Sequence, residues 1–280
     1  MLKAVNLIDY ETLWRDMVIL GEQRRARKTK TSSADQWHGK ATEFAQRVND
    51  RWLHKDSSRD FVKKTLLDNP RSSVLDIGAG SGAWVSFIAP HASWITAIDP
   101  SDSMLRQLEN RVNTEKLQNV KIIKGCWPDV QVEPHDISFC SHAMYGVENF
   151  VDFIKAMHES TLKRIILLIR APKDDGLMAQ AAKLVWGHPF DSPNYQIAIN
   201  ILWKMGIFPN VIMEDDHLWK PWSHPSLEDA LSEMKNRLGL FDSLEWDEKL
   251  RGLLASNLQF QSGEYIWPSA IRTALLYWDM

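Results

Sequence analysis

The 280-residue sequence contains few cysteines, no long apolar run and no surplus of basic residues. Its two cysteines, Cys126 and Cys140, lack the paired spacing of a zinc site and are too few for a disulfide framework. We therefore expect buried thiols, no metal and a reducing, cytoplasmic location. No stretch approaches the ~18–20 apolar residues of a membrane-spanning helix. The first residues also lack the apolar segment of a signal peptide.

The charge of the chain is close to balanced. The formal net charge is −3 and the sequence pI is about 6.3, whereas a dedicated nucleic-acid binder carries a strong basic surplus. A local basic run still favours two interpretations, a solvated helix face or a patch for RNA. The run consists of Arg24, Arg25, Arg27, Lys28 and Lys30.

Strand and helix signals alternate in the middle of the chain. Short apolar segments, each typical of a buried strand, occur at 73–78, 94–99, 120–123, 136–141 and 164–169. Helical spacing of apolar residues separates them, at 83–89, 104–112 and 149–160. Such alternation predicts a parallel sheet that is covered by helices on both faces.

The flanks of this region are mainly helical. Helical periodicity precedes it at 9–22, 37–52 and 58–67, and follows it at 177–185, 195–205 and 227–238. Two further strand signals occur at 211–213 and 271–278. We therefore predict an α/β fold, with a doubly wound, seven-stranded and mostly parallel sheet and a C-terminal antiparallel strand. N-terminal helices and a helical insertion complete the predicted architecture.

A glycine-rich turn, residues 78–82, joins the first predicted strand to a helix. Glycines there permit positive φ and close approach of a ligand, and ligands bind at the carboxyl ends of such strands. Gly78, Gly80 and Ala83 satisfy a dinucleotide-binding pattern, and Asp99 follows Gly78 by 21 residues, near the distance of a ribose-binding acid. A nicotinamide or flavin oxidoreductase is therefore one candidate.

Two features favour a different ligand. Asp76 precedes Gly78 by two residues, and its carboxylate suits a cationic, amine-bearing ligand but would repel a pyrophosphate. Gly82 extends the turn to a G-x-G-x-G pattern, which allows close approach of a compact amino-acid moiety.

The same segments resemble a known family. Residues 76–82 resemble motif I of the class I S-adenosylmethionine (SAM)-dependent methyltransferases, and residues 98–104 resemble their acidic second-strand motif. Residues 125–127 lie where that family contacts the adenine edge, and residues 139–145 resemble the fourth-strand motif beside the transferred methyl group. Together the motifs cover about residues 70–172. They imply SAM as the cofactor and give almost no information about the methyl acceptor.

The resemblance implies a set of cofactor contacts. Asp76 would orient the amino end of SAM, Asp99 would accept both ribose hydroxyls, and Met104 would pack on the adenine. Many relatives carry an acid where this chain has Cys126, so stacking by Trp127 would have to support the adenine. The expected cofactor-binding residues are Asp76, Gly78, Ala79, Gly80, Gly82, Asp99, Pro100, Ser101, Met104, Cys126, Trp127 and Ser141.

His142 and Tyr145 are the candidates on the acceptor side. A histidine suits proton transfer near neutral pH, although the sulfonium is already a strong electrophile and alignment of the nucleophile can suffice. Residues 174–208 and the first ~50 residues are expected to form a lid. Aromatic side chains concentrated in this region or just beyond it suit an ammonium cage, a bound ring or ordinary packing. They are Trp186, His188, Trp203, His217, Trp219 and Trp222.

The sequence therefore predicts a SAM-dependent methyltransferase that acts on a small molecule, without nucleic acid or membrane as a partner. Residues 1–69 would form an N-terminal helical segment, residues 70–172 a Rossmann-like SAM-binding core, and residues 173–280 a helical lid with the final strands. An RNA (tRNA) methyltransferase, an oxidoreductase and a catalytically silent SAM-binding module stay open as alternatives. The acceptor atom and the oligomeric state are undetermined at this stage.

Overall fold

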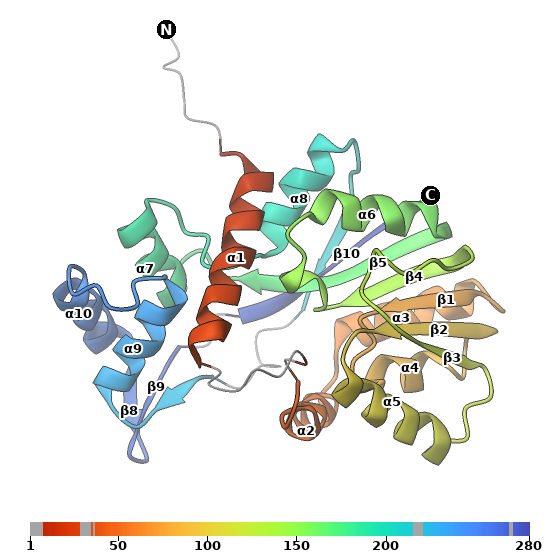
Figure 1. Cartoon of the computed structure of the whole chain (residues 1–280), viewed down its shortest axis with the longest axis horizontal. Coiled ribbons are helices and arrows are strands. Elements are labelled where there is room, and N and C mark those ends of the chain that lie inside the picture. Colours follow the sequence, from red (N-terminus) through yellow and green to blue (C-terminus); the bar gives the residue numbers. More distant parts are fainter. Residues whose placement is uncertain (1–7, 29–34, 36, 215–220, 269–270) are drawn as a thin grey trace, which may run out of the picture.

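The computed structural model describes residues 8–28, 35, 37–214, 221–268 and 271–280, arranged around one large sheet (Figure 1). The seven strands follow the order β3-β2-β1-β4-β5-β10-β6. They are β1 (Ser73–Ile77), β2 (Trp94–Asp99), β3 (Val120–Lys124), β4 (His135–Ser141), β5 (Thr161–Pro172), β6 (Asn210–Met213) and β10 (Ile271–Asp279). Only β10 runs antiparallel to its neighbours, β5 and β6. The predicted sheet is confirmed.

The central strands are apolar on both faces. Five consecutive residues of β5, 165–169, are almost completely buried, as expected for a strand covered by helices on each side. β1 pairs in parallel with β2 on one side and with β4 on the other. The order of the strands therefore reverses between β1 and β4, and in such sheets a ligand crevice lies at this point, beyond the carboxyl ends of the strands.

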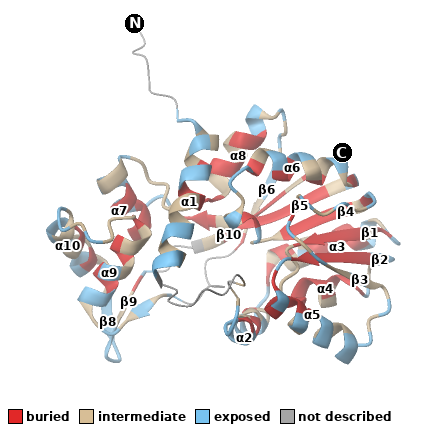
Figure 2. Cartoon of the chain, viewed as in Figure 1, coloured by how far each residue is buried: buried red, intermediate tan, exposed pale blue. Residues whose placement is uncertain are grey.

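Helices cover both faces of the sheet (Figure 2). On one face, Trp14 of α1 is completely buried in a core that it shares with α6 and α8. On the other face, α3, α4 and α5 contribute to a second core. The bounds are α1 (Tyr10–Lys28), α3 (Ser57–Asp68), α4 (Ala83–Ile88), α5 (Asp102–Thr114), α6 (Phe150–Glu159) and α8 (Tyr195–Lys204). Helices α1 and α3 of the predicted N-terminal segment thus belong to the packing of the sheet.

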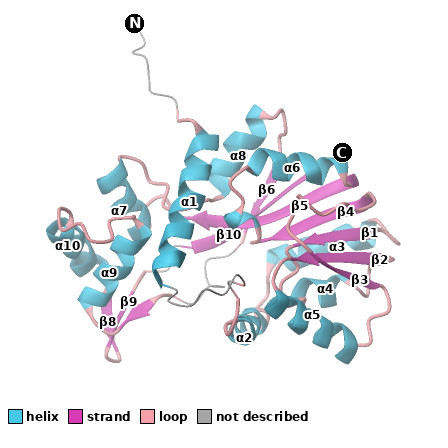
Figure 3. Ribbon diagram, viewed as in Figure 1, coloured by secondary structure: helices cyan, strands magenta, loops and turns pink. Residues whose placement is uncertain are grey.

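A smaller unit lies beside the sheet (Figure 3). It combines three helices with a three-stranded sheet of order β7-β9-β8. Met234, Leu250 and Trp267 are buried in its own core. The elements are α7 (Leu177–Trp186), α9 (Leu227–Arg237), α10 (Asp247–Asn257), β7 (Ser223–His224), β8 (Gln259–Gln261) and β9 (Glu264–Ile266). Helix α1 packs against both α8 and α9, and therefore links this unit to the large sheet.

Some boundaries differ from the prediction. Helix α1 continues past Glu22 to Lys28, so Arg24, Arg25 and Arg27 of the basic run lie on its last turns. Lys30 and residues 31–33, where we expected a hinge or helix start, lie outside the described residues. Helix α10 and the small sheet were not predicted at all. Among the helices that the structure describes, none has the length and apolar character needed to cross a membrane.

Candidate functional site

Two cavities meet beyond the carboxyl ends of β1, β4 and β5. The first, the glycine crevice, has a volume of about 570 Å³ and includes Gly78, Asp99 and Met104 in its wall. The second, the aromatic chamber, has a volume of about 660 Å³ and includes Trp222 and Met178. Both volumes are typical of sites for small molecules. The two cavities share lining residues, among them Ser141, His142, Tyr145 and Arg170.

The glycine turn has the backbone that its sequence predicts. Gly78, Gly80 and Gly82 all have positive φ, at 72°, 57° and 80°. A Cβ atom on Gly78 would lie 2.1 Å from the Cβ of Ala143, so a side chain cannot be placed there without displacing the loop after β4. The backbone N–H groups of Gly78 and Ala79 both donate to the Ile98 carbonyl, which ties the turn to β2. Glycine is therefore required by both conformation and space.

Asp99 organises this turn through its carboxylate. It accepts hydrogen bonds from the backbone N–H groups of Gly80 and Ser101, both at 2.9 Å. Burial raises its pKa above the ordinary value, against the effect of these two bonds. The side chain thus lies at the wall of the crevice in a fixed orientation.

Asp76 has a buried carboxyl oxygen that lacks a hydrogen-bond partner among the described residues. Its residue is 1% exposed, and Oδ2 forms no hydrogen bond within the described residues. Burial and the nearby charge of Asp99 raise the pKa of Asp76 to about 8. An unpaired buried acid of this kind is stabilised by any cationic donor that reaches it.

The other predicted cofactor contacts are only partly brought together. Pro100, Met104, Cys126 and Trp127 line the glycine crevice, whereas Ala79 and Asp76 line the aromatic chamber and Ser141 lines both. Ser101 and Gly82 line neither cavity.

In the structure, Ser101 forms the N-terminal cap of α5. Its hydroxyl donates to Asp35 at 2.7 Å and accepts from the N–H of Met104, capping α5. Asp35, which the sequence did not single out, also accepts from the N–H of Ser103. Although burial acts to raise the pKa of Asp35, these hydrogen bonds lower it well below its usual range. An ionised Asp35 at the N-terminus of α5 stabilises that helix.

Trp127 and Cys126 follow β3 at the edge of the glycine crevice. The indole N–H of Trp127 donates to the Phe153 carbonyl at 3.2 Å, and the residue is only 8% exposed. Its ring is therefore fixed in the wall. Cys126 is exposed, so the expectation of two buried thiols is wrong for this residue, because it lies in the loop beyond the strand rather than within it. Cys140, inside β4, is buried as expected.

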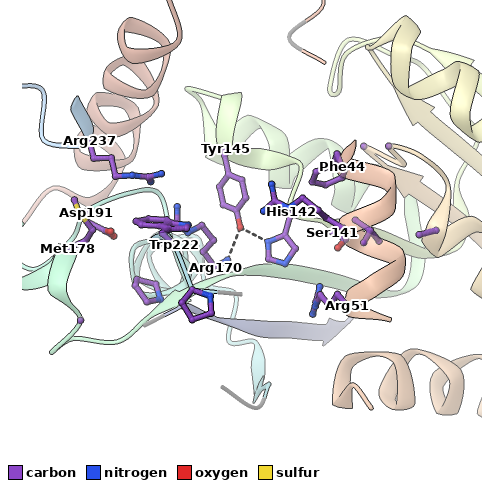
Figure 4. A pocket seen from close by; sticks show the side chains of 18 of the residues that line it. Phe44, Arg51, Ser141, His142, Tyr145, Arg170, Met178, Asp191, Trp222 and Arg237 are labelled. Atoms are coloured by element: carbon purple, nitrogen blue, oxygen red, sulfur yellow. Dashed lines mark hydrogen bonds between the residues drawn. The ribbon is translucent and has the colours of Figure 1, made fainter. Parts of the chain in front are cut away.

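His142 and Tyr145 form a hydrogen-bonded pair on the wall between the cavities (Figure 4). The Tyr145 hydroxyl oxygen accepts from the backbone N–H of Arg170 and lies 2.7 Å from His142 Nδ1. The other ring nitrogen, Nε2, lies 3.2 Å from Thr273 Oγ1, so both nitrogens have a hydroxyl neighbour, and the tautomer of the ring sets which atom of each pair donates. Burial, aided by Arg51 and Arg170, lowers the pKa of His142 to about 3. Burial also raises the pKa of Tyr145, so both side chains are neutral near pH 7.

Three arginines from separate elements line both cavities: Arg24 of α1, Arg170 of β5 and Arg237 of α9. Arg237 pairs with Glu233 at 2.7 Å, and its guanidinium lies 3.8 Å from the ring centroid of Trp222 (Figure 4). Sequence reasoning assigned Arg24 to a basic run and missed the other two. The available signal was Arg170 itself, a charged residue directly after the most apolar strand segment.

Arg51 on α2 (Ala41–Arg51) also lines the aromatic chamber, but its charge is compensated. It forms ion pairs with Asp56 at 3.2 Å and with Glu214 at 2.6 Å, and all three side chains are buried. Ser58 donates a further hydrogen bond to Glu214. This cluster joins α2 and α3 to the segment after β6.

The predicted aromatic lid is only partly present at the chamber. Trp222 lines it, whereas Trp203 is 54% exposed on α8, and Trp186 packs near His188 with ring centroids 5.7 Å apart. His217 and Trp219 lie outside the described residues. The remaining aromatic lining was not predicted. It consists of Trp37, Phe44, Trp52, Trp84 and Trp267.

Comparisons with known proteins identify a related domain and a shared fold. Residues 74–163 match the family model described as a methyltransferase domain. A putative methyltransferase from Bacillus halodurans has the same fold, with a TM-score of 0.51 and 13% identity over 77% of this chain and 97% of that one. A SAM-dependent methyltransferase from Geobacter sulfurreducens was solved in complex with S-adenosyl-L-homocysteine. Its TM-score is 0.49 and its sequence identity 17%, over 78% of this chain and 89% of that one. No curated protein matches the sequence.

Proposed function

From the premise that this chain carries a SAM-dependent methyltransferase domain, we propose that it methylates a small organic acceptor bound in the aromatic chamber. One observation supports this most: the glycine crevice and the aromatic chamber share a wall at Ser141, His142 and Tyr145. A donor in the first cavity would thus face an acceptor in the second. SAM supplies an electrophilic methyl group on a sulfonium, so the protein's task is mainly alignment.

The residues of the glycine crevice, together with Asp76 in the adjoining wall of the aromatic chamber, fit this cofactor. The unpartnered carboxyl of Asp76 suits the ammonium group of the methionine moiety, and the turn at Gly78 and Gly80 leaves room that a side chain would fill. The Asp99 carboxylate, oriented by two backbone N–H groups, suits the ribose hydroxyls. Met104 and Trp127 supply an apolar wall for the adenine.

We assign His142 and Tyr145 to positioning rather than to proton abstraction. With a pKa of about 3 and both ring nitrogens at hydrogen-bonding distance from a neighbour, His142 is neutral near pH 7 and held in place. Together with Tyr145 it forms a rigid wall against which the acceptor is oriented. Exclusion of water and in-line placement of the nucleophile then account for the rate.

Size and position support a small acceptor. The aromatic chamber is within the volume range of metabolite sites and takes walls from the N-terminal helices and from residues beyond 172, in line with the proposed three-part organisation. Two free thiols, Cys126 and Cys140, support a reducing compartment such as the cytoplasm.

The test is calorimetric titration with SAM and S-adenosylhomocysteine, followed by incubation of the protein with labelled SAM and either a metabolite extract or tRNA. We expect both nucleosides to bind, label to enter small molecules, and Asp99→Ala to abolish binding. Asp102→Ala, an exposed acid paired with Lys124, is the matched control and should bind as the wild type does. Lack of binding by a well-folded protein would refute the proposal, and label in tRNA would favour the RNA alternative.

A further inference from the structure

The three arginines of the shared wall form one electrostatic cluster. Besides burial, the charges of Arg24 and Arg170 both lower the pKa of Arg237, to about 10. Burial and the charge of Arg170 likewise lower the pKa of Arg24. Guanidinium groups that lower each other's pKa lie close together and repel one another. Figure 4 shows Arg237 and Arg170 on either side of Trp222.

The cluster has more positive charge than its acids neutralise. Glu233 and Asp191 are the carboxylates that act on Arg24 and Arg237. Among the described residues, these three guanidinium groups face two carboxylates, which leaves at least one positive charge over, and the nearby Arg25 adds to it. The surplus is most evident at Arg170, whose Nε and Nη2 are buried without a hydrogen-bond partner within the described part of the chain. Arg51, by contrast, contacts two acids. An uncompensated buried cation is costly unless an anion reaches it.

The position of the cluster favours the acceptor over the cofactor. β5, which carries Arg170, is separated from β1 by β4. At about 4.8 Å per strand, the β5 residue level with Asp76, which is Ile166, lies roughly 10 Å from it. Arg170 lies four residues further along β5 and is therefore more distant still. The neighbouring wall is apolar and comes from the smaller unit, with Leu177, Met178 and Trp222. An anionic group at Arg170 would therefore belong to a molecule whose body lies in the aromatic chamber.

We propose that the acceptor is a molecule that carries a carboxylate group. The carboxylate lies against Arg170, Arg24 and Arg237, and the apolar body of the molecule packs on Trp222 and Met178. The inference rests on the proposed function, in which the aromatic chamber holds the acceptor. A single surplus charge matches a monoanion better than a phosphate dianion. An ammonium acceptor is disfavoured because the guanidinium of Arg237 already lies over the face of Trp222.

The test compares three ligands of one shape by calorimetry: 2-naphthoate, neutral 2-naphthamide and 2-naphthyl phosphate, each with and without saturating S-adenosylhomocysteine. In the wild type we expect naphthoate to bind at least about tenfold more tightly than the amide, the range of a charged hydrogen bond. Arg170→Gln should remove this preference and change the affinity for S-adenosylhomocysteine less than about twofold. Arg24→Gln, on a less enclosed helix, should reduce the preference by about threefold.

The matched control is Arg251→Gln. Arg251 lies on α10, paired with Glu228, and does not line either cavity. It should keep the full preference for naphthoate. If Arg170→Gln fails to fold, the preference of Arg24→Gln for naphthoate over naphthamide tests the inference in its place.

Several results would overturn the inference. In the wild type, these results are equal affinity for naphthoate and naphthamide, no binding of either, or tighter binding of the phosphate. In Arg170→Gln, the contradicting result is a loss of affinity for S-adenosylhomocysteine alone. The last result would assign the cluster to the cofactor's carboxylate. A wild-type protein that prefers naphthoate but binds no S-adenosylhomocysteine would instead refute the proposed function and leave the anion site standing.

Discussion

The glycine crevice and the aromatic chamber differ in how the chain builds them. One wall of the crevice comes from consecutive strand ends between residues 77 and 127, where backbone N–H groups and the Asp99 carboxylate fix its shape, and the remaining walls come from elements as distant as α1 and α9. The chamber takes side chains from residues as far apart as 24 and 268. Local backbone geometry thus fixes the glycine turn and Asp99, whereas the arginine and aromatic walls depend on tertiary packing. Substitutions should therefore separate the two.

The largest effect is expected from Gly78→Ala, which tests the glycine turn that borders both cavities. A Cβ there would lie 2.1 Å from Ala143 Cβ. The strained φ costs about 1 kcal/mol and the overlap about 1–3 kcal/mol more, so S-adenosylhomocysteine binding should be lost. Gly187→Ala, with φ of 80° and no neighbouring atom within 4 Å, should show only the strain. Adding Ala143→Gly should partly restore Gly78→Ala, as measured by calorimetry and chemical denaturation, and no recovery would contradict the overlap.

The next effect is expected from Asp99→Asn. The amide keeps the shape but loses the charge that accepts from Gly80 and Ser101. Affinity for S-adenosylhomocysteine should fall by roughly 30–100-fold, or about 2–3 kcal/mol. The preference of the chamber for naphthoate should stay unchanged in the same titrations. If both cavities weakened together, the proposed independence would be wrong.

A smaller, pH-dependent effect is expected from Asp76→Asn. Because burial raises the folded-state pKa of Asp76 to about 8, its contribution to stability is present below the unfolded value of 3.8 and is lost as pH rises through about 8. The wild type should thus lose stability between pH 4 and 8 more steeply than Asp76→Asn, in thermal melts. Ligand binding that ionises Asp76 should release a proton, and S-adenosylhomocysteine affinity should rise with pH only in the wild type. Parallel curves would contradict this assignment.

The smallest effect is expected from Tyr145→Phe. It removes the acceptor of the Arg170 N–H and the contact with His142, at a cost of about 1 kcal/mol in unfolding free energy. His142, with its pKa lowered to about 3, should show no ring titration by NMR between pH 5 and 8. Since its folded-state pKa is below the unfolded value of 6.5, its neutral form adds stability that is lost as pH falls from 6.5 towards 3. A titration near 6.5 would restore His142 as a candidate base.

The same contrast explains what the sequence could predict. The strands from β1 to β5, the glycine turn and the position of Asp99 follow from short local patterns, and all were predicted within a few residues. Helix α10 and the small sheet escaped because α10 is mostly polar and β8 and β9 have only three residues each. Arg170 and Arg237 become neighbours only through packing of the smaller unit against the sheet. No helical or strand periodicity in the sequence predicts that these two residues lie close together.

The position of β10 has a consequence for how the protein is made. Among the strands that the structure describes, β6 pairs only with β10, although about 60 residues separate them in the chain. During synthesis, β6 leaves the ribosome after α7 but before the rest of the smaller unit, and long before its partner β10. β6 cannot join the sheet until β10 inserts beside β5. Pairing of β10 with β5 and β6 is therefore a non-local and slow step of folding. A chaperone that shields β6 and the bare edge of β5 in the interval would raise the yield of native protein.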